Sequence, residues 1–270
     1  MKKKLLGLFL SIVMVFSVTG NVSAQGYGKE VDVNVMSFNI YHGVGLDGVL
    51  DLKRTAKVIT DAGAEIIGIQ EVDRFWSSRS DFQDQAKELA EILGYHYVYG
   101  ANLDRSPAEG QEENRQYGTA ILSKYPIIDS ENIHLDSFGN EQRGLLHAKI
   151  NVRGIHVNFY NTHLGLSVEE RISQVQEVID ISSSFEGPNV LVGDLNAEPH
   201  SEEFQLLLNE GNFVDVFEGL DHANTFPVEN PIKRIDFILT SPSVKATNQE
   251  VISTEASDHL PVVSKLVFKR

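Results

Sequence analysis

The sequence predicts a mixed α/β (α+β) fold in one large domain. Residues 31–99 alternate short apolar strands with amphipathic helices, and residues 117–162 divide into four consecutive strands separated by turn residues. The chain has 270 residues and no cysteine. The domain must therefore be held by its hydrophobic core, and thiolate metal sites are excluded.

Residues 1–24 are predicted to be a secretion signal rather than part of the domain. Lysines at positions 2 to 4 precede the apolar run Leu5–Val18, and Val22-Ser23-Ala24 has the small residues of a cleavage site. The run is short for a membrane-spanning helix, so cleavage after Ala24 is preferred to an uncleaved anchor. No cysteine follows the run, which excludes a lipoprotein anchor. We expect a domain over 25–270, of 270 − 24 = 246 residues, outside the cell and without a transmembrane segment.

The acidity of the chain narrows its partners. The formal net charge is −15, and loss of the three signal lysines takes it to −15 − 3 = −18. Proteins that grip a nucleic-acid backbone usually carry a basic face, because phosphate contacts dominate their affinity. Tight binding of duplex nucleic acid is therefore not expected, whereas hydrolysis of a small phosphoester with a metal ion is compatible with this charge.

The first strand of the domain is predicted at Val31–Asn39, followed by a glycine-rich segment and a helix over Leu50–Ala62. The segment 42–48 matches the G-x-G-x-x-G pattern of dinucleotide-binding loops, with Glu71 near the expected position of a ribose-binding acid. An extracellular protein has little use for a nicotinamide cofactor, and this interpretation leaves the later motifs unexplained. The glycines are therefore interpreted as loop residues.

The second strand, Glu65–Gln70, ends directly before Glu71. A carboxylate that follows a buried apolar strand is costly unless it is paired or binds a cation. The sequence leaves two alternatives open, a metal ligand or a salt bridge to Arg74 or Arg79.

A helix over Asp84–Leu93 follows, with Gly94 at its C-terminus, and then a third strand over Tyr95–Tyr99. The segment Ala101–Gln116 is polar and contains one proline, so it is predicted to be a mobile loop. Such a loop is equally compatible with a role in substrate choice and with a solvated surface excursion.

Two polar side chains stand at the ends of the strands that come next. Arg143 stands at the start of the third of these strands, where it either forms a surface salt bridge or binds phosphate. His163 stands at the end of the fourth strand, and a lone histidine in such a position is usually structural. The four strands are predicted at Tyr117–Ser123, Ile127–Leu135, Gly144–Val152 and Ile155–Thr162.

The segment Asn189–Pro199 is the strongest local signal in the chain, and it follows a helix over Val168–Ser184. Its apolar run is predicted to be a buried strand that presents Asp194 and Asn196 to one cleft and turns Leu195 into the core. A carboxylate can deprotonate a water, and an amide can donate to a developing oxyanion. The alternative is an Asx turn, in which both side chains bond their own backbone.

The last third of the chain repeats the pattern of acidic residues at strands. A helix over Ser201–Asn209 precedes a strand over Arg234–Thr240, which has Asp236 in its interior. The last strand, Leu260–Val267, follows Asp258 and His259. A buried aspartate needs a partner or a ligand, and an adjacent aspartate and histidine suit a metal beside a phosphate.

Eight motifs occur in the order of the endonuclease/exonuclease/phosphatase superfamily of metal-dependent phosphoesterases, which the chain resembles from about Val31 to Phe268. They are SFN, IQEVD, GTAILSKYP, QRG, NTHL, GDLNAEP, RIDFI and SDHLPV. The sequence around these motifs is most similar to small secreted bacterial members of the superfamily, including those that resemble the phosphodiesterase-like domains of glycosylphosphatidylinositol remodelling. The resemblance implies a four-layer sandwich of two mixed β-sheets flanked by helices.

The resemblance also implies a role for each candidate residue. On the metal side, Glu71 resembles the metal-binding glutamate, with Asn39 beside it and Asp258 as a second carboxylate. Mg²⁺ is the expected ion, with Mn²⁺ or Ca²⁺ as alternatives. The resemblance gives the remaining residues roles at the water and the phosphate. Asp194 orients or deprotonates the water, and Asn196 donates to the transition state. His259 contacts phosphate and is held by Asp236, and phosphate is also contacted by His163 and Arg143. We expect these side chains to line one cleft.

The implied activity is that of a secreted phosphodiesterase or phosphomonoesterase, acting as a monomer on a small ester or a lipid headgroup. An extracellular nuclease of the same superfamily is one alternative. A non-catalytic binding module is another, disfavoured because Glu71, Asp194, Asn196 and His259 are all present. Sphingomyelinase-like members generally have exposed aromatic loops, and this chain has a single tryptophan, Trp76. Inositol-phosphate 5-phosphatases have a WxGDxNxR form where this chain has VLVGDLNAE.

Overall fold

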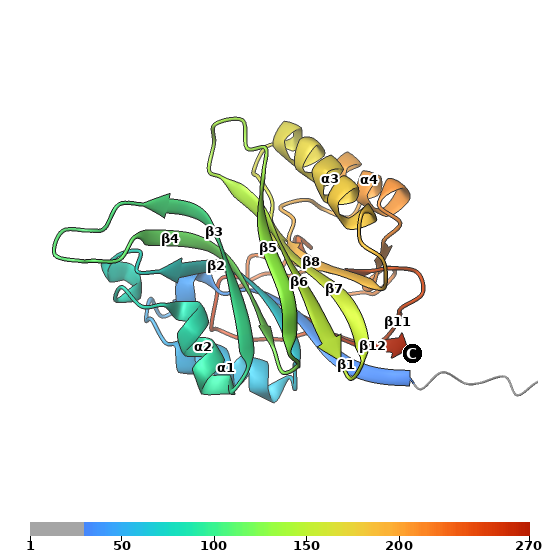
Figure 1. Cartoon of the computed structure of the whole chain (residues 1–270), viewed down its shortest axis with the longest axis horizontal. Helices are drawn as coiled ribbons and strands as arrows, with labels where there is room; N and C mark the ends of the chain where they lie inside the picture. The colour runs from blue at the N-terminus through green and yellow to red at the C-terminus, as the bar shows by residue number, and fades with distance from the viewer. Residues whose placement is uncertain (1–29) are drawn as a thin grey trace, which may run out of the picture.

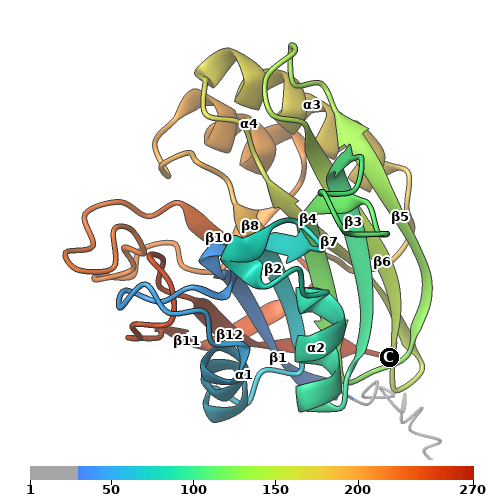
Figure 2. The same cartoon turned by 90° about the vertical axis from the view of Figure 1, so that its left-hand side faces the viewer.

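The computed structural model describes residues 30–270, so the predicted signal segment 1–24 lies outside the described residues. Two six-stranded β-sheets pack face to face (Figure 1). Helices α1 and α2 cover the outer face of one sheet, and α3 and α4 cover the outer face of the other (Figure 2). The predicted four-layer sandwich is therefore confirmed. The helices are α1 (Leu52–Asp61), α2 (Gln85–Leu93), α3 (Val168–Ser183) and α4 (Glu202–Glu210).

Both sheets are mixed because each contains one parallel pair of strands joined through a helix. β1 is parallel to β2 across α1, and β7 is parallel to β8 across α3, while the other pairs are antiparallel. The first sheet has the order β11 (Lys245–Val251), β12 (Val262–Lys269), β1 (Glu30–Asn39), β2 (Ile66–Arg74), β4 (Arg115–Ser123) and β3 (His96–Arg105). The second has the order β5 (Ile127–Leu135), β6 (Arg143–Val152), β7 (Ile155–His163), β8 (Asn189–Asp194), β10 (Asp236–Thr240) and β9 (Val214–Asp215).

The helices begin where polar side chains bond their free backbone N–H groups. Asp51 and Asp84 cap α1 and α2, and Ser167 forms a capping box with Glu170 at the start of α3. Their apolar faces pack on the sheets in two separate cores, and a third core fills the space between the sheets. Among the described residues, no helix is long and apolar enough to cross a membrane.

The two sheets approach closely beside the strand ends that carry polar residues. A Cβ atom at Gly68 of β2 would collide with Val192 of β8 and with Asn161 of β7, so only glycine fits there without movement. Asn161 donates to the carbonyls of Ile69 and Ala120 across the interface, at 2.9 and 2.8 Å. These buried, satisfied bonds fix the relative position of the sheets.

The prediction of a mobile loop over Ala101–Gln116 is wrong at both ends. β3 continues to Arg105 and β4 begins at Arg115, and the two strands pair through this region as a hairpin. The side chains are polar because the hairpin projects beyond the body of the sheet, as Figure 1 shows. Polar composition therefore indicated exposure correctly but not the absence of a strand.

The strand predicted at Arg234–Thr240 begins at Asp236, so this aspartate is not in the strand interior. Arg234 turns away and forms an ion pair with Asp215 at 2.6 Å. The last strand likewise begins two residues later than predicted and ends at Lys269. The edge strands β9 and β11 were not predicted, because β9 has two residues and β11 has few buried ones.

Candidate active site

The strand topology brings the predicted residues of four strands to one edge of the sandwich. Parallel strands present their carboxyl ends at the same edge. In the first sheet Asn39 ends β1 and Glu71 lies in the distal part of β2. In the second sheet His163 of β7 and Asp194 of β8 end their strands in direct register.

Antiparallel neighbours complete the edge from the opposite direction, because their first residues lie beside the last residues of the parallel strands. Asp236 opens β10 opposite Asp194. Asp258 and His259 precede β12, which is antiparallel to β1. Arg143 opens β6, beside β7.

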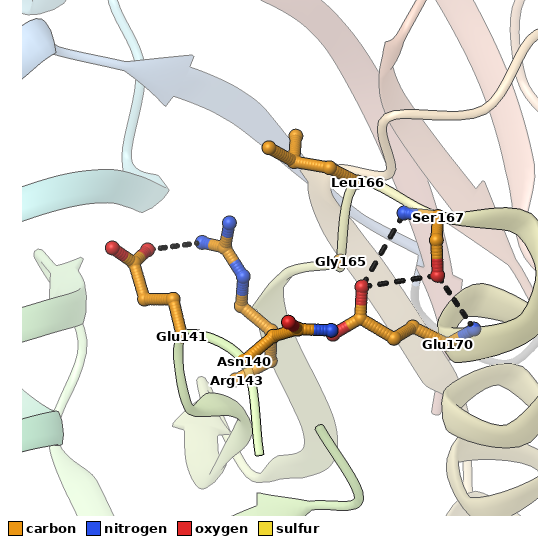
Figure 3. A pocket seen from close by; sticks show the side chains of 7 residues that line it. All are labelled: Asn140, Glu141, Arg143, Gly165, Leu166, Ser167 and Glu170. Carbon is orange, nitrogen blue, oxygen red and sulfur yellow. Dashed lines mark hydrogen bonds and ion pairs between the residues drawn. The ribbon is translucent and has the colours of Figure 1, made fainter. Parts of the chain in front are cut away.

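Arg143 is buried, and its Nη1 lies 3.0 Å from Oε1 of Glu141 (Figure 3). The alternative of a salt bridge is thus realised, and both partners line a pocket rather than an open surface. Burial lowers the pKa of His163 well below its usual value, and the charge of Arg143 lowers it further. His163 is therefore neutral, next to a permanent cation.

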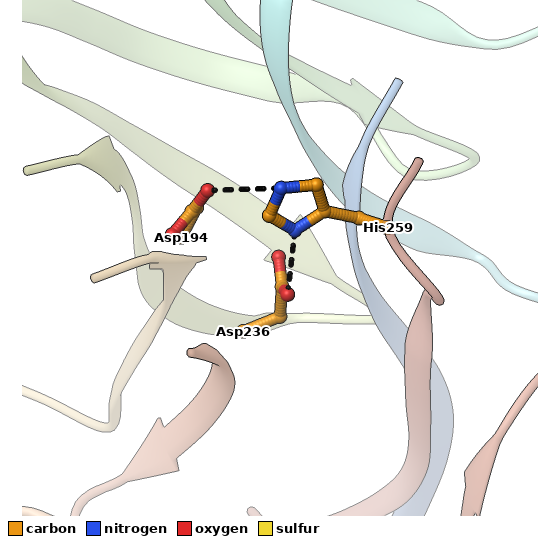
Figure 4. Close-up of side chains that lie close together, drawn as sticks. All are labelled: Asp194, Asp236 and His259. Carbon is orange, nitrogen blue, oxygen red and sulfur yellow. Dashed lines mark hydrogen bonds and ion pairs between the residues drawn. The ribbon is translucent and has the colours of Figure 1, made fainter. Parts of the chain in front are cut away.

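Asp236, His259 and Asp194 form a chain of close polar contacts (Figure 4). His259 Nδ1 lies 2.9 Å from Asp236 Oδ2, and its Nε2 lies 3.7 Å from Asp194 Oδ2. Burial alone would lower the pKa of His259, but Asp236, followed by Asp194 and Asp258, raises it to about 10. His259 is therefore an imidazolium whose Nδ1–H donates to Asp236.

Asp194 contacts three other candidate residues, Asn39, His163 and His259. Its Oδ2 accepts a hydrogen bond from Asn39 Nδ2 at 3.1 Å and lies 3.6 Å from His163 Nε2. Burial and the neighbouring charge of Asp236 raise the pKa of Asp194 to about 7. Its Oδ1 accepts from the backbone N–H of Asn196 at 3.0 Å, so the Asx turn considered from the sequence is present. Leu195 is buried in the core, as predicted, and the presentation of Asp194 and Asn196 to one cleft stays a prediction.

Glu71 has no basic partner among the described residues. Arg74 is paired with Asp84 and Arg79 with Asp73, so the two salt bridges considered from the sequence are absent there. Glu71 Oε1 accepts from Asn39 Nδ2 at 3.1 Å, and its backbone has a φ of 58°. Burial raises the pKa of Glu71, and the charge of Asp258 raises it further.

A sequence model described as the Endonuclease/Exonuclease/phosphatase family matches residues 36–259. The chain belongs to the endonuclease/exonuclease/phosphatase family. The predicted resemblance is thus confirmed, and members of this family are hydrolases that act on phosphoesters.

Individual relatives cover the chain to different extents. Protein YbhP of Escherichia coli (strain K12), an uncharacterized protein, is 27% identical over 259 residues, which cover 88% of this chain and 97% of YbhP. A putative neutral sphingomyelinase of Caenorhabditis elegans is 25% identical over 194 residues, 63% of this chain and 41% of that protein. The crystal structure of an endonuclease/exonuclease/phosphatase from Beutenbergia cavernae matches with a TM-score of 0.75 and 27% identity, covering 87% of this chain and 71% of that one.

Three residues that contact the candidate site residues were missed from the sequence. Thr225 Oγ1 donates to Asp236 Oδ2 at 2.6 Å, and the ring of Phe226 packs on His259 with centroids 4.7 Å apart. Both lie in an irregular segment without periodicity. Ser257, inside the SDHLPV motif, donates to the carbonyl of Asn39 at 2.7 Å and so ties β1 to the loop before β12. Its place beside Asp258 was the signal that would have found it.

The donor chemistry of the metal side fits a hard divalent cation. Glu71 and Asp258 are partly buried carboxylates that each have a raised pKa, in which burial is the largest cause. Two such groups close together are relieved by a cation with oxygen ligands. Asn39 Oδ1 accepts from the N–H of Tyr41 at 3.1 Å and keeps a second lone pair, so its assignment as a ligand stays a prediction.

Asp194, Asp236 and His259 also offer ligand atoms within 4.8 Å of one another. A metal would need the neutral imidazole, whereas the bond from Nδ1 to Asp236 and the raised pKa favour the protonated ring. We therefore interpret these three residues as one hydrogen bond, from His259 to Asp236, and one longer charge contact, from His259 to Asp194, rather than as a metal site. The assignment of Glu71 as a metal ligand stays a prediction.

Proposed function

We propose that this protein is a secreted, metal-dependent phosphoester hydrolase that directs a water to phosphorus. The observation that carries the proposal is the chain from Asp236 through His259 to Asp194, with Asn39 connecting Asp194 to Glu71. This chain brings a charged imidazole, a buried carboxylate and the carboxylate of Glu71 together at one edge of the sheets. Secretion is proposed from the signal-like residues 1–24.

Each residue has a separate task in this proposal. Asp194 orients the water and takes one of its protons, which suits a buried carboxylate that can hold a proton. His259 donates from Nε2 to a phosphate oxygen while Asp236 holds its other nitrogen. Asn196 uses one Nδ2 hydrogen to bond the carbonyl of Leu164 at 3.0 Å, and the second is available to the transition state. Arg143 and the neutral His163 bind the remaining phosphate oxygens.

Glu71 and Asp258, with Asn39, would hold Mg²⁺, and Mn²⁺ or Ca²⁺ are alternatives. When bound, the ion supplies positive charge for the phosphate oxygens and lowers the pKa of a nearby water. The need for that charge follows from the site, which combines several carboxylates with two cations, Arg143 and His259, in a chain of net charge −15.

The test is a screen of the mature protein against phosphomonoesters, phosphodiesters and lipid-headgroup esters with each of the three metals. A lipid headgroup is included because one relative is named a putative neutral sphingomyelinase. Hydrolysis that stops on chelation is the expected result. Absence of hydrolysis of every ester with every metal would contradict the proposal.

A further inference from the structure

Two cavities flank the proposed phosphate-binding residues. The first, here the Arg143 cavity, has a volume of about 360 Å³ and is bordered by Arg143, Asn140 and Glu170 (Figure 3). The second, here the Asn196 cavity, has a volume of about 570 Å³ and is bordered by Asn196 and Phe226. Both volumes fall within the range of pockets that hold small organic groups.

Leu166 lines both cavities, which therefore adjoin each other at this residue. It lies three residues after His163, and 74% of its surface is exposed. A ligand that occupies either cavity can therefore contact this leucine.

Each cavity opens beside a different part of the proposed site. The Arg143 cavity includes a guanidinium held in place by Glu141. The Asn196 cavity includes the ring of Phe226, which packs on the phosphate-binding His259. A phosphate bound by His163 and His259 therefore has space for an organic group on two sides.

A phosphomonoester carries one organic group, whereas a phosphodiester carries two. We propose that the substrate is a phosphodiester, with one substituent in the Arg143 cavity and the other in the Asn196 cavity. This inference rests on the proposed function. In the reaction the oxygen of water bonds to phosphorus, one ester P–O bond breaks, and the two hydrogens of the water end on the monoester product and on the released alcohol.

The cavities differ in lining as well as in size, so the two substituents are not interchangeable. The wall of the Arg143 cavity is rigid because Glu170 is buried and accepts from Ser167 N and Oγ, at 3.3 and 3.2 Å. The lining of the Asn196 cavity combines the apolar Phe226 with charges of both signs, namely Arg171, Lys233, Glu198, Glu202 and Glu203. One of the two ester bonds should therefore be cleaved in preference to the other when the substituents differ.

The experiment compares bis(p-nitrophenyl) phosphate with p-nitrophenyl phosphate, which have the same leaving group. Asn140→Trp narrows the Arg143 cavity and Val168→Trp narrows the Asn196 cavity; both positions are exposed. Val214→Trp, at an exposed position on the edge strand β9 that borders neither cavity, is the matched control. Circular dichroism and a thermal melt confirm that each variant folds. If a cavity variant fails to fold, Leu166→Trp is tested in its place, because Leu166 lines both cavities.

We expect the wild type to have the higher kcat/KM on the diester. Each cavity variant should lower kcat/KM on the diester about tenfold or more. In one of the two cavity variants, the ratio of kcat/KM on the diester to kcat/KM on the monoester should also fall. The Val214→Trp control should keep the wild-type kcat/KM on both esters. Faster hydrolysis of the monoester, or wild-type activity on the diester in both folded cavity variants, would overturn the inference while leaving the proposed function intact. Absence of hydrolysis of either ester with every metal would instead contradict the proposed function.

Discussion

Asp236→Asn tests whether His259 acts through the carboxylate that holds it. Asp236 Oδ2 accepts from His259 Nδ1 at 2.9 Å and from Thr225 Oγ1 at 2.6 Å, and the other oxygen of Asp236 is buried without a partner. An asparagine can accept both bonds with its amide oxygen, but it removes the negative charge. The ring then stays near its place while its protonated form is less favoured.

The size of the effect follows from the kind of bond that is lost. Charge-assisted hydrogen bonds contribute about 1.5–3 kcal/mol and neutral ones about 0.5–1.5 kcal/mol, so the exchange weakens the bond to His259 by about 1–1.5 kcal/mol. At roughly 1.4 kcal/mol for each tenfold change in rate, kcat should fall about 5- to 12-fold. His259→Ala, which removes the donor itself, should lower kcat by about two to four orders of magnitude with little change in KM.

The assay is steady-state kinetics across a pH series on whichever ester the screen identifies, with circular dichroism to confirm folding. Because Asp236 raises the pKa of His259, activity that needs the imidazolium is lost as pH rises through that pKa, and the loss should begin at lower pH in Asp236→Asn. Thr225→Val, which removes only the second bond to the same oxygen, should have the smaller effect. A folded Asp236→Asn variant with kcat within twofold of wild type and an unchanged pH profile would refute this role.

Three further predictions concern the metal, the core and pH. Glu71→Gln should raise the metal concentration needed for activity, because the ligand set loses one charge, and full activity of the wild type in excess chelator would contradict metal dependence. Gly68→Ala should lower the free energy of unfolding in urea by about 1–3 kcal/mol, because its Cβ collides with Val192 across the sheets; an unchanged value would show that the sheets can separate there. Burial lowers the pKa of His42 to about 4, so between about pH 6.5 and 4 the unfolded state binds more protons and stability falls as pH falls. His42→Asn, which tolerates the positive φ, should lose less stability than wild type in urea melts over that window; equal loss would assign it to other groups.

The polar residues at strand ends could be predicted from the sequence more accurately than the strand boundaries and the irregular segments that connect the strands. Glu71, His163 and Asp194 each lie at or near the end of a buried strand, and a parallel pair necessarily presents such residues at one edge. Asp236 was misplaced because Arg234 and Ile235 have strand-like composition, although β10 begins only at Asp236 and the side chain of Arg234 pairs with Asp215 of the neighbouring strand β9. Alternation in a strand reports which residues share a face, but it does not report where pairing starts.

Thr225 and Phe226 were beyond reach of the sequence for a different reason. They belong to an irregular segment whose position depends on tertiary contacts, such as the backbone bond from Leu260 N to the carbonyl of Thr225 at 2.8 Å. Such contacts link residues far apart in the chain and leave no periodic pattern. The hairpin of β3 and β4 shows the opposite case, in which a ladder of backbone bonds overrides a polar, turn-like composition.

In the proposed function, one charged and one neutral histidine explain how so acidic a protein can hold a phosphate. His163 and His259 both have Nε2 within 4 Å of the same oxygen of Asp194, at 3.6 and 3.7 Å. Only His259 has a carboxylate on its other nitrogen, so it is charged, whereas burial keeps His163 neutral. One ring therefore supplies a cation and the other an uncharged donor, and binding of an anion requires no change in the protonation of either. The charge that His259 offers to a phosphate is thus maintained by Asp236, a residue that need not touch the substrate.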